Sequence, residues 1–81
     1  MPRSSRSPRQ ARLRELLIVQ RISAGLTQED VALRLRRPQS FVSKYENGER
    51  RLDIIEFMEV TEAIGGDAIG LLTELLTVPQ S

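Results

Sequence analysis

The chain has 81 residues, a formal net charge of +1, and neither cysteine nor histidine. This length fits one small domain, and the missing residue types exclude a disulfide framework, thiolate or imidazole metal sites and histidine general-base catalysis. We therefore expect no cofactor and no metal. The sequence has neither an N-terminal apolar stretch of signal-peptide length nor a run of about 18 apolar residues, which predicts a cytoplasmic protein without a membrane segment.

The charge is divided unevenly along the chain. Residues 1–21 carry +5, residues 22–51 carry +2 and residues 52–81 carry −6, so every basic residue precedes Leu52. Such a division is typical of a cationic face for a polyanion and a separate role for the acidic end. Taken alone, it fits an ordinary solvated surface equally well.

Three regions are expected in chain order. Residues 1–8 hold Ser, Pro and Arg with no apolar residue after Met1, and are predicted to form a disordered basic arm. A helical domain follows over residues 9–76, and residues 77–81 form a flexible tail. The first helix is expected to begin near Arg9 and to stop at Gly25, with apolar residues at helical spacing at Leu13, Leu16 and Leu17.

A second helix is predicted from Gln28 to about Arg36. Thr27 is a typical N-cap for it, and Asp30 lies near the position of a capping-box acid. Acidic residues fall in its first turn and arginines in its last turn, which suits the helix dipole.

Pro38 separates this helix from a third one, because proline cannot lie inside a helix and disfavours the α conformation of the residue before it. The third helix is predicted to begin near Gln39 and to end at Gly48, with Val42 and Tyr45 directed inward.

Two further helices complete the predicted domain. Asp53 caps the fourth and Asp67 the fifth, which runs through Leu76. The residues expected to point inward from the fourth helix are Ile54, Phe57, Val60 and Ile64. No β-alternation of useful length occurs, so the sequence predicts an all-α domain of five short helices.

A short turn joining the second and third helices is the helix-turn-helix arrangement. Over GLTQEDVALRL, SFVSKYENG and DIIEFMEVTEAIG, about residues 16–72, the chain resembles the Cro/C1-type (lambda-repressor-like, XRE) helix-turn-helix family. The joint spacing is specific, with Gln39 eleven residues after Gln28 and then Ser-x-x-Glu-x-Gly. The resemblance implies a compact five-helix lambda-repressor-like fold. The chain departs from the family at Arg36, Arg37 and Pro38, where Gly, an aliphatic residue and Ser are frequent.

In this motif, the N-terminal part of the third helix faces base edges in the major groove. Gln39 suits an adenine edge and Lys44 a guanine edge, whereas Phe41 either contacts a thymine methyl or packs against the end of the second helix. The candidate base-contacting residues are Gln39, Ser40, Phe41, Ser43 and Lys44.

A second group of candidates surrounds this helix. Gln28 lies at a helix N-terminus, which suits a phosphate, and by resemblance it buttresses Gln39; otherwise it is a polar first-turn residue. Glu46 is expected to bond internally, to a backbone donor or to an arginine such as Arg50. The candidate phosphate-contacting residues are Gln28, Arg37, Asn47, Arg50 and Arg51. Four N-terminal arginines either contact DNA as an arm or are simply solvated: Arg3, Arg6, Arg9 and Arg12.

The C-terminal leucines form an apolar stripe that either only closes the core or also forms a dimer seam. The candidate dimer residues are Leu71, Leu75, Leu76 and Val78.

The resemblance implies a sequence-specific regulator of transcription that binds double-stranded DNA. We expect a nucleoid-associated repressor that acts as a homodimer on a two-fold operator. The alternative is an antitoxin-like interaction module whose acidic C-terminal half binds a partner protein. RNA polymerase and a toxin are the candidate protein partners. An enzyme is disfavoured, because the sequence has no paired-carboxylate site, glycine-rich phosphate loop or metal-ligand spacing.

Overall fold

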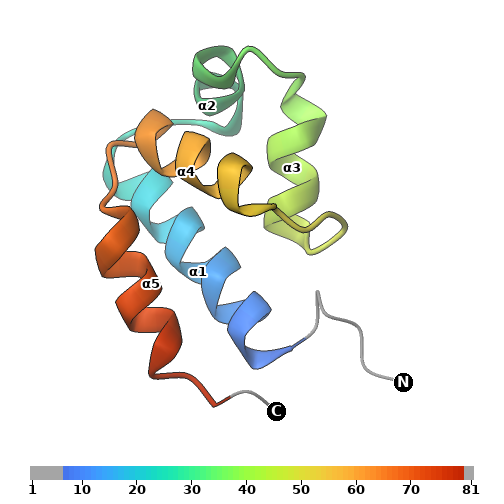
Figure 1. The fold of residues 1–81 in the computed structure, drawn as a ribbon. Helices are drawn as coiled ribbons and strands as arrows, with labels where there is room; N and C mark the ends of the chain where they lie inside the picture. Colours follow the sequence, from blue (N-terminus) through green and yellow to red (C-terminus); the bar gives the residue numbers. More distant parts are fainter. Residues whose placement is uncertain (1–6, 80–81) are drawn as a thin grey trace.

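The computed structural model describes residues 7–79, and within them it contains five helices and no strand. The helices are α1 (Pro8–Ser23), α2 (Gln28–Leu35), α3 (Gln39–Asn47), α4 (Ile54–Ala63) and α5 (Ala68–Leu76). Figure 1 shows α5 alongside α1, and α2 and α3 on the side of the molecule away from α5. The predicted all-α five-helix fold is confirmed. The predictions for Arg3 and Arg6 and for the last two residues of the tail concern residues outside the described range.

Local sequence accounts for most helix boundaries. Ser7 accepts a hydrogen bond from the backbone N–H of Gln10 and caps α1, which begins with Pro8, one residue earlier than expected. Thr27 and Asp30 form a complete capping box at the start of α2. These bonds satisfy backbone N–H groups that a helix N-terminus otherwise leaves without partners. They fix the first residue of α2, which is Gln28.

The core collects apolar side chains from all five helices. Its buried members are Leu17, Val31, Ala32, Phe41, Val42, Tyr45, Phe57, Val60, Ile64 and Leu71. Two predictions need correction. Ile54 is 59% exposed, because the buried first-turn position of α4 is taken by Glu56. Leu71 is only 2% exposed, so it belongs to the monomer core and is not free to form a dimer seam.

The turn between α2 and α3 closes without the usual glycine. Arg36 adopts the left-handed conformation with φ 59°, and the N–H groups of Arg36 and Arg37 bond to the carbonyls of Leu33 and Ala32. This is the hydrogen-bonding pattern that glycine normally supports at a helix C-terminus. Pro38 then precedes α3 without a side-chain cap. The unusual residues therefore preserve the turn geometry, at the cost of a strained arginine.

Replacing this arginine tests the strain. Arg36→Gly is expected to be about 1 kcal/mol more stable than Arg36→Ala, because both remove the charge and only glycine relieves the positive φ. Urea titration followed by circular dichroism measures the difference in free energy of unfolding. Equal stability of the two variants would contradict a strained turn.

Candidate nucleic-acid interface

Helix α3 is buried along one side and open along the other. Its buried side chains are those of Phe41, Val42, Tyr45 and Glu46. The open face carries Gln39, Ser40, Lys44 and Asn47, all exposed, with Ser43 half-buried among them. Because these five recur at helical spacing, they form one polar strip along the helix.

Phe41 does not belong to this strip. It is 7% exposed, and its ring meets that of Tyr45 edge-on with the centroids 5.5 Å apart. The guanidinium carbons of Arg37 and Arg50 lie 4.4 and 4.8 Å from the Phe41 centroid, within cation–π range. Phe41 is therefore a packing residue. A contact with a thymine methyl would require an accessible ring, so Phe41 is removed from the base-contacting candidates.

Gln28 and Gln39 meet at the start of the strip. The Gln39 Nε2 atom donates to Gln28 Oε1 at 3.4 Å, and the Gln28 Nε2 atom donates to Glu46 Oε1 at 2.9 Å. Glu46 has the arginine partner that the sequence led us to expect, but this is Arg21 of α1 rather than Arg50. Nε and Nη2 of Arg21 bond to its two carboxylate oxygens at 2.7 and 3.0 Å.

Arg50 is instead paired with Glu56 of α4. Its two terminal nitrogens donate to the two Glu56 oxygens at 2.9 and 2.8 Å, and Arg37 approaches the same carboxylate at 3.6 Å. Glu56 also accepts from the backbone N–H of Asp53 at 3.0 Å. The Arg50 bonds, followed by this backbone bond, lower the pKa of Glu56 to about 2. The two arginines still expose 36% and 39% of their side chains.

The stability of this cluster is expected to depend on pH. The folded pKa of Glu56 lies below its ordinary value of 4.5, so its contribution is complete above that pH and disappears as the pH falls toward 2. Glu56→Gln is expected to lose about 1–2 kcal/mol at pH 7, allowing for solvent screening of the exposed Arg50. In urea titrations, the difference in free energy of unfolding between Glu56→Gln and wild type should shrink as the pH falls from 5 to 2.

A matched control is Glu59→Gln. Glu59 is half exposed and lies 3.9 Å from Arg37, so its loss should change the free energy of unfolding little. A deficit for Glu56→Gln that is constant across this pH range would contradict the role given to the Glu56 carboxylate.

The loop after α3 brings basic side chains next to the strip. Gly48 ends α3 with φ +82°, and a Cβ atom there would lie 3.0 Å from the guanidinium carbon of Arg14. The backbone conformation therefore favours glycine, and a Cβ atom would also displace the guanidinium of Arg14, the end of a flexible side chain, by a few tenths of an ångström. Arg51 follows in the same loop as an exposed side chain. The sequence did not predict that Arg14 of α1 would lie beside this loop.

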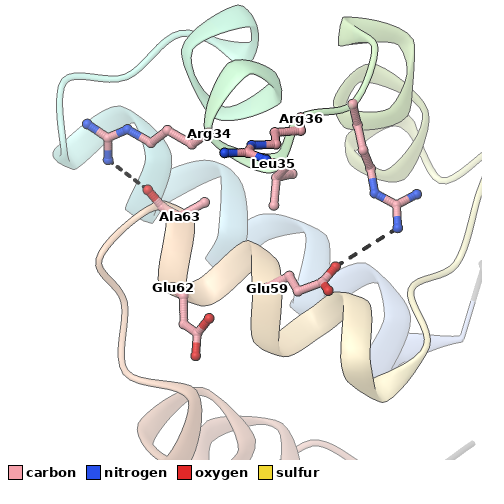
Figure 2. A pocket seen from close by; sticks show the side chains of 7 residues that line it. Arg34, Leu35, Arg36, Glu59, Glu62 and Ala63 are labelled. Atoms are coloured by element: carbon pink, nitrogen blue, oxygen red, sulfur yellow. Dashed lines mark hydrogen bonds and ion pairs between the residues drawn. The ribbon is translucent and has the colours of Figure 1, made fainter.

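Figure 2 shows an open hollow between the end of α2 and the outer side of α4. Arg34 donates to the carbonyl of Ala63 at 2.7 Å across one side (Figure 2). Arg37, which also lines the hollow, lies 3.9 Å from Glu59. These contacts tie α2 to α4 and so help to hold the helix pair α2–α3.

The described residues contain no group of three or more His, Cys, Asp or Glu side chains that could hold a metal. No described helix is long and apolar enough to cross a membrane.

Comparison with known proteins identifies the family. A helix-turn-helix family model matches residues 17–70, two thirds of the chain and the part that builds this surface. An XRE-family-like protein from Pseudomonas syringae pv. tomato shares 54% sequence identity, with a TM-score of 0.82 over 85% of this chain and 84% of that one. The chain belongs to the XRE family of helix-turn-helix proteins. No curated protein matches it significantly.

Two more distant XRE-like folds are also similar in structure. The gene regulator ClgR from C. glutamicum has 25% identity and a TM-score of 0.73, over 85% of this chain and 88% of that one. The restriction-modification controller protein C.Esp1396I has 19% identity and a TM-score of 0.74, over 83% and 88% of the two chains. At this lower identity the likeness concerns the fold.

Sequence reasoning missed the ion pairs that link different elements, such as Arg21 with Glu46 and Arg50 with Glu56. Arg21 lies one helical turn after the buried Leu17, and Glu46 directly follows the buried Tyr45. The only signal for the Arg21–Glu46 pair was that a basic and an acidic residue each lie on the inward face of a helix. Nothing local indicated that the two faces meet.

Proposed function

We propose that the chain is a sequence-specific transcriptional regulator that binds double-stranded DNA by placing α3 in the major groove. The observation that carries the proposal is the polar strip of α3, whose first residue, Gln39, is hydrogen-bonded to Gln28 at the N-terminus of α2. Any amphipathic helix exposes polar side chains, so the distinguishing feature is that the first residue of this strip is held by a side chain of α2. The fold and family support the same reading.

The roles follow from position and chemistry. Gln39, Ser40, Ser43 and Lys44 are the proposed base-contacting residues, since hydroxyl, amide and ammonium groups match base edges. Phosphate contacts are proposed for the last residue of the strip and for the residues that border it, where charge and backbone N–H groups position the protein without reading sequence. These are Gln28, Arg37, Asn47, Arg50 and Arg51.

Two structural neighbours support regulation as the role. ClgR is described as a clp gene regulator. The controller protein C.Esp1396I was crystallised as a tetramer with its natural 35 base-pair operator. By analogy we propose that this chain also acts in more than one copy and represses by covering a promoter.

A homodimer is supported by an apolar stripe on α5. Ile69, Leu72 and Leu76 are spaced along one helix face and are 74%, 38% and 72% exposed. This changes the proposed seam, because Leu71 is buried in the core, whereas Leu75 and Val78 are half-buried and remain available at its edge. Two copies joined in this way can read two half-sites about 34 Å apart. Sedimentation with and without DNA measures the number of copies.

The decisive experiment is titration of the protein against duplexes, including a random library and the DNA upstream of its own coding region. We expect a preferred duplex and an affinity that falls steeply with salt. Lack of preference for any duplex would remove the proposal and favour the alternative, in which the acidic C-terminal half binds a partner protein and DNA binding is secondary.

A further inference from the structure

A continuous path of side-chain hydrogen bonds leads from α1 to the proposed DNA-facing strip. It runs from Arg21 to Glu46 at 2.7 and 3.0 Å, from Gln28 to Glu46 at 2.9 Å and from Gln39 to Gln28 at 3.4 Å. The path joins residues 18 and 25 positions apart and ends on the first residue of α3. Its inner members are enclosed, with 4% of the Glu46 side chain and 14% of the Arg21 side chain exposed.

The chemistry of this path gives it a direction. A carboxylate only accepts hydrogen bonds, whereas an amide has one end that donates and one that accepts. Glu46 therefore requires Gln28 to turn its NH₂ group inward, which leaves the Gln28 oxygen facing α3. That oxygen in turn favours the orientation in which Gln39 presents its own NH₂ group, which lies 3.4 Å away at the exposed end of the path. One buried acceptor thus determines the orientation of two successive amides.

The inner end of the path is held rigidly. Arg21 grips both oxygens of Glu46 and also donates to the carbonyl of Leu26 at 3.0 Å, just before the capping box that begins α2. Because Gln28 is the first residue of α2, its backbone position is set by the same cap. The carboxylate plane and the amide that bonds to it are therefore both fixed before any DNA is bound.

We propose that Glu46 is a positioning residue for base recognition, which fixes which end of the Gln39 amide donates and which accepts at the base edge. With one N–H used on Gln28, Gln39 keeps a second N–H and its oxygen for a bidentate contact. Adenine offers the matching pair, an acceptor at N7 and a donor at N6. A reversed amide would set donor against donor and acceptor against acceptor. This inference rests on the proposed function.

The test is a double-mutant cycle read base pair by base pair. Binding of wild type, Glu46→Gln, Gln39→Ala and the double variant is measured on the preferred duplex and on all its single base-pair substitutions. Glutamine at position 46 can donate as well as accept, so the amides lose their imposed direction. We expect Glu46→Gln to lose about tenfold discrimination at the base pair that Gln39→Ala identifies, and little elsewhere. The double variant should lose no more there than Gln39→Ala.

Two further variants keep the result interpretable. Glu49→Gln removes the same charge from an exposed position near α3 and should retain the full discrimination. If Glu46→Gln does not fold, the paired change Arg21→Met with Glu46→Gln removes the uncompensated guanidinium and replaces it in the cycle.

A readout without DNA separates this inference from the proposed function. In NMR spectra of the free protein, the Gln28 side-chain NH₂ signals should show a hydrogen bond to a carboxylate, through a downfield shift and slowed exchange, and should change in Glu46→Gln. A wild-type protein without duplex preference would overturn the proposed function and leave the NMR result to decide the amide orientation. Unchanged Gln28 signals, retained discrimination in Glu46→Gln or an equal loss at every base pair would each overturn the inference.

Discussion

Glu46→Ala is expected to lower the free energy of unfolding by about 3–5 kcal/mol, because it leaves the Arg21 guanidinium enclosed without its partner. In the wild-type protein Arg21 makes two bonds to Glu46, which strengthen its protonated state and raise its pKa. The loss is large for a domain of this size, whose total stability is expected to be in the range of about 5–15 kcal/mol. Urea titration at pH 7 measures it.

The paired replacement Arg21→Met with Glu46→Leu is the control. It removes both charges and fills a similar volume with apolar groups, so it should recover most of the stability lost in Glu46→Ala. A loss below about 1 kcal/mol for Glu46→Ala would show that the pair is solvated, contrary to its low exposure.

Lys44→Ala is expected to weaken binding to the preferred duplex by about 1–3 kcal/mol, roughly 5- to 150-fold, and to relax the preference at one base pair. Lys44 lies exposed on the strip of α3, where an ammonium group can reach guanine O6 and N7. Measuring affinities for a set of single base-pair substitutions locates the relaxed position.

Arg51→Ala is the matched variant, since it removes one positive charge from the adjoining loop. It should weaken all duplexes alike and reduce the slope of log affinity against log salt by about one. If Lys44→Ala also weakened every duplex equally, Lys44 would be a phosphate contact. Arg50→Ala is less suitable for this comparison, because Arg50 also holds Glu56 and would change stability.

Local signals in the sequence were sufficient for the helices and for the motif. Thr27 with Asp30, Pro38 and Gly48 set boundaries that the structure reproduces, because capping and backbone restrictions involve residues within one turn. The resemblance to the family likewise implied that Gln28 buttresses Gln39, and the structure contains a contact between them.

Only the tertiary structure decided which polar groups meet and which apolar ones are buried. Phe41 was ambiguous, Ile54 was expected inside and Leu71 was expected at a dimer seam, since helical spacing defines a face without saying what covers it. The pairings of Arg21 with Glu46 and of Arg50 with Glu56 depend on how whole helices pack. Sequence alone therefore determined the five helices and the strip of α3. How the residues around that strip are held was determined by the contacts of α1 with α3 and of α4 with the loop after α3. These contacts join residues that no local pattern links.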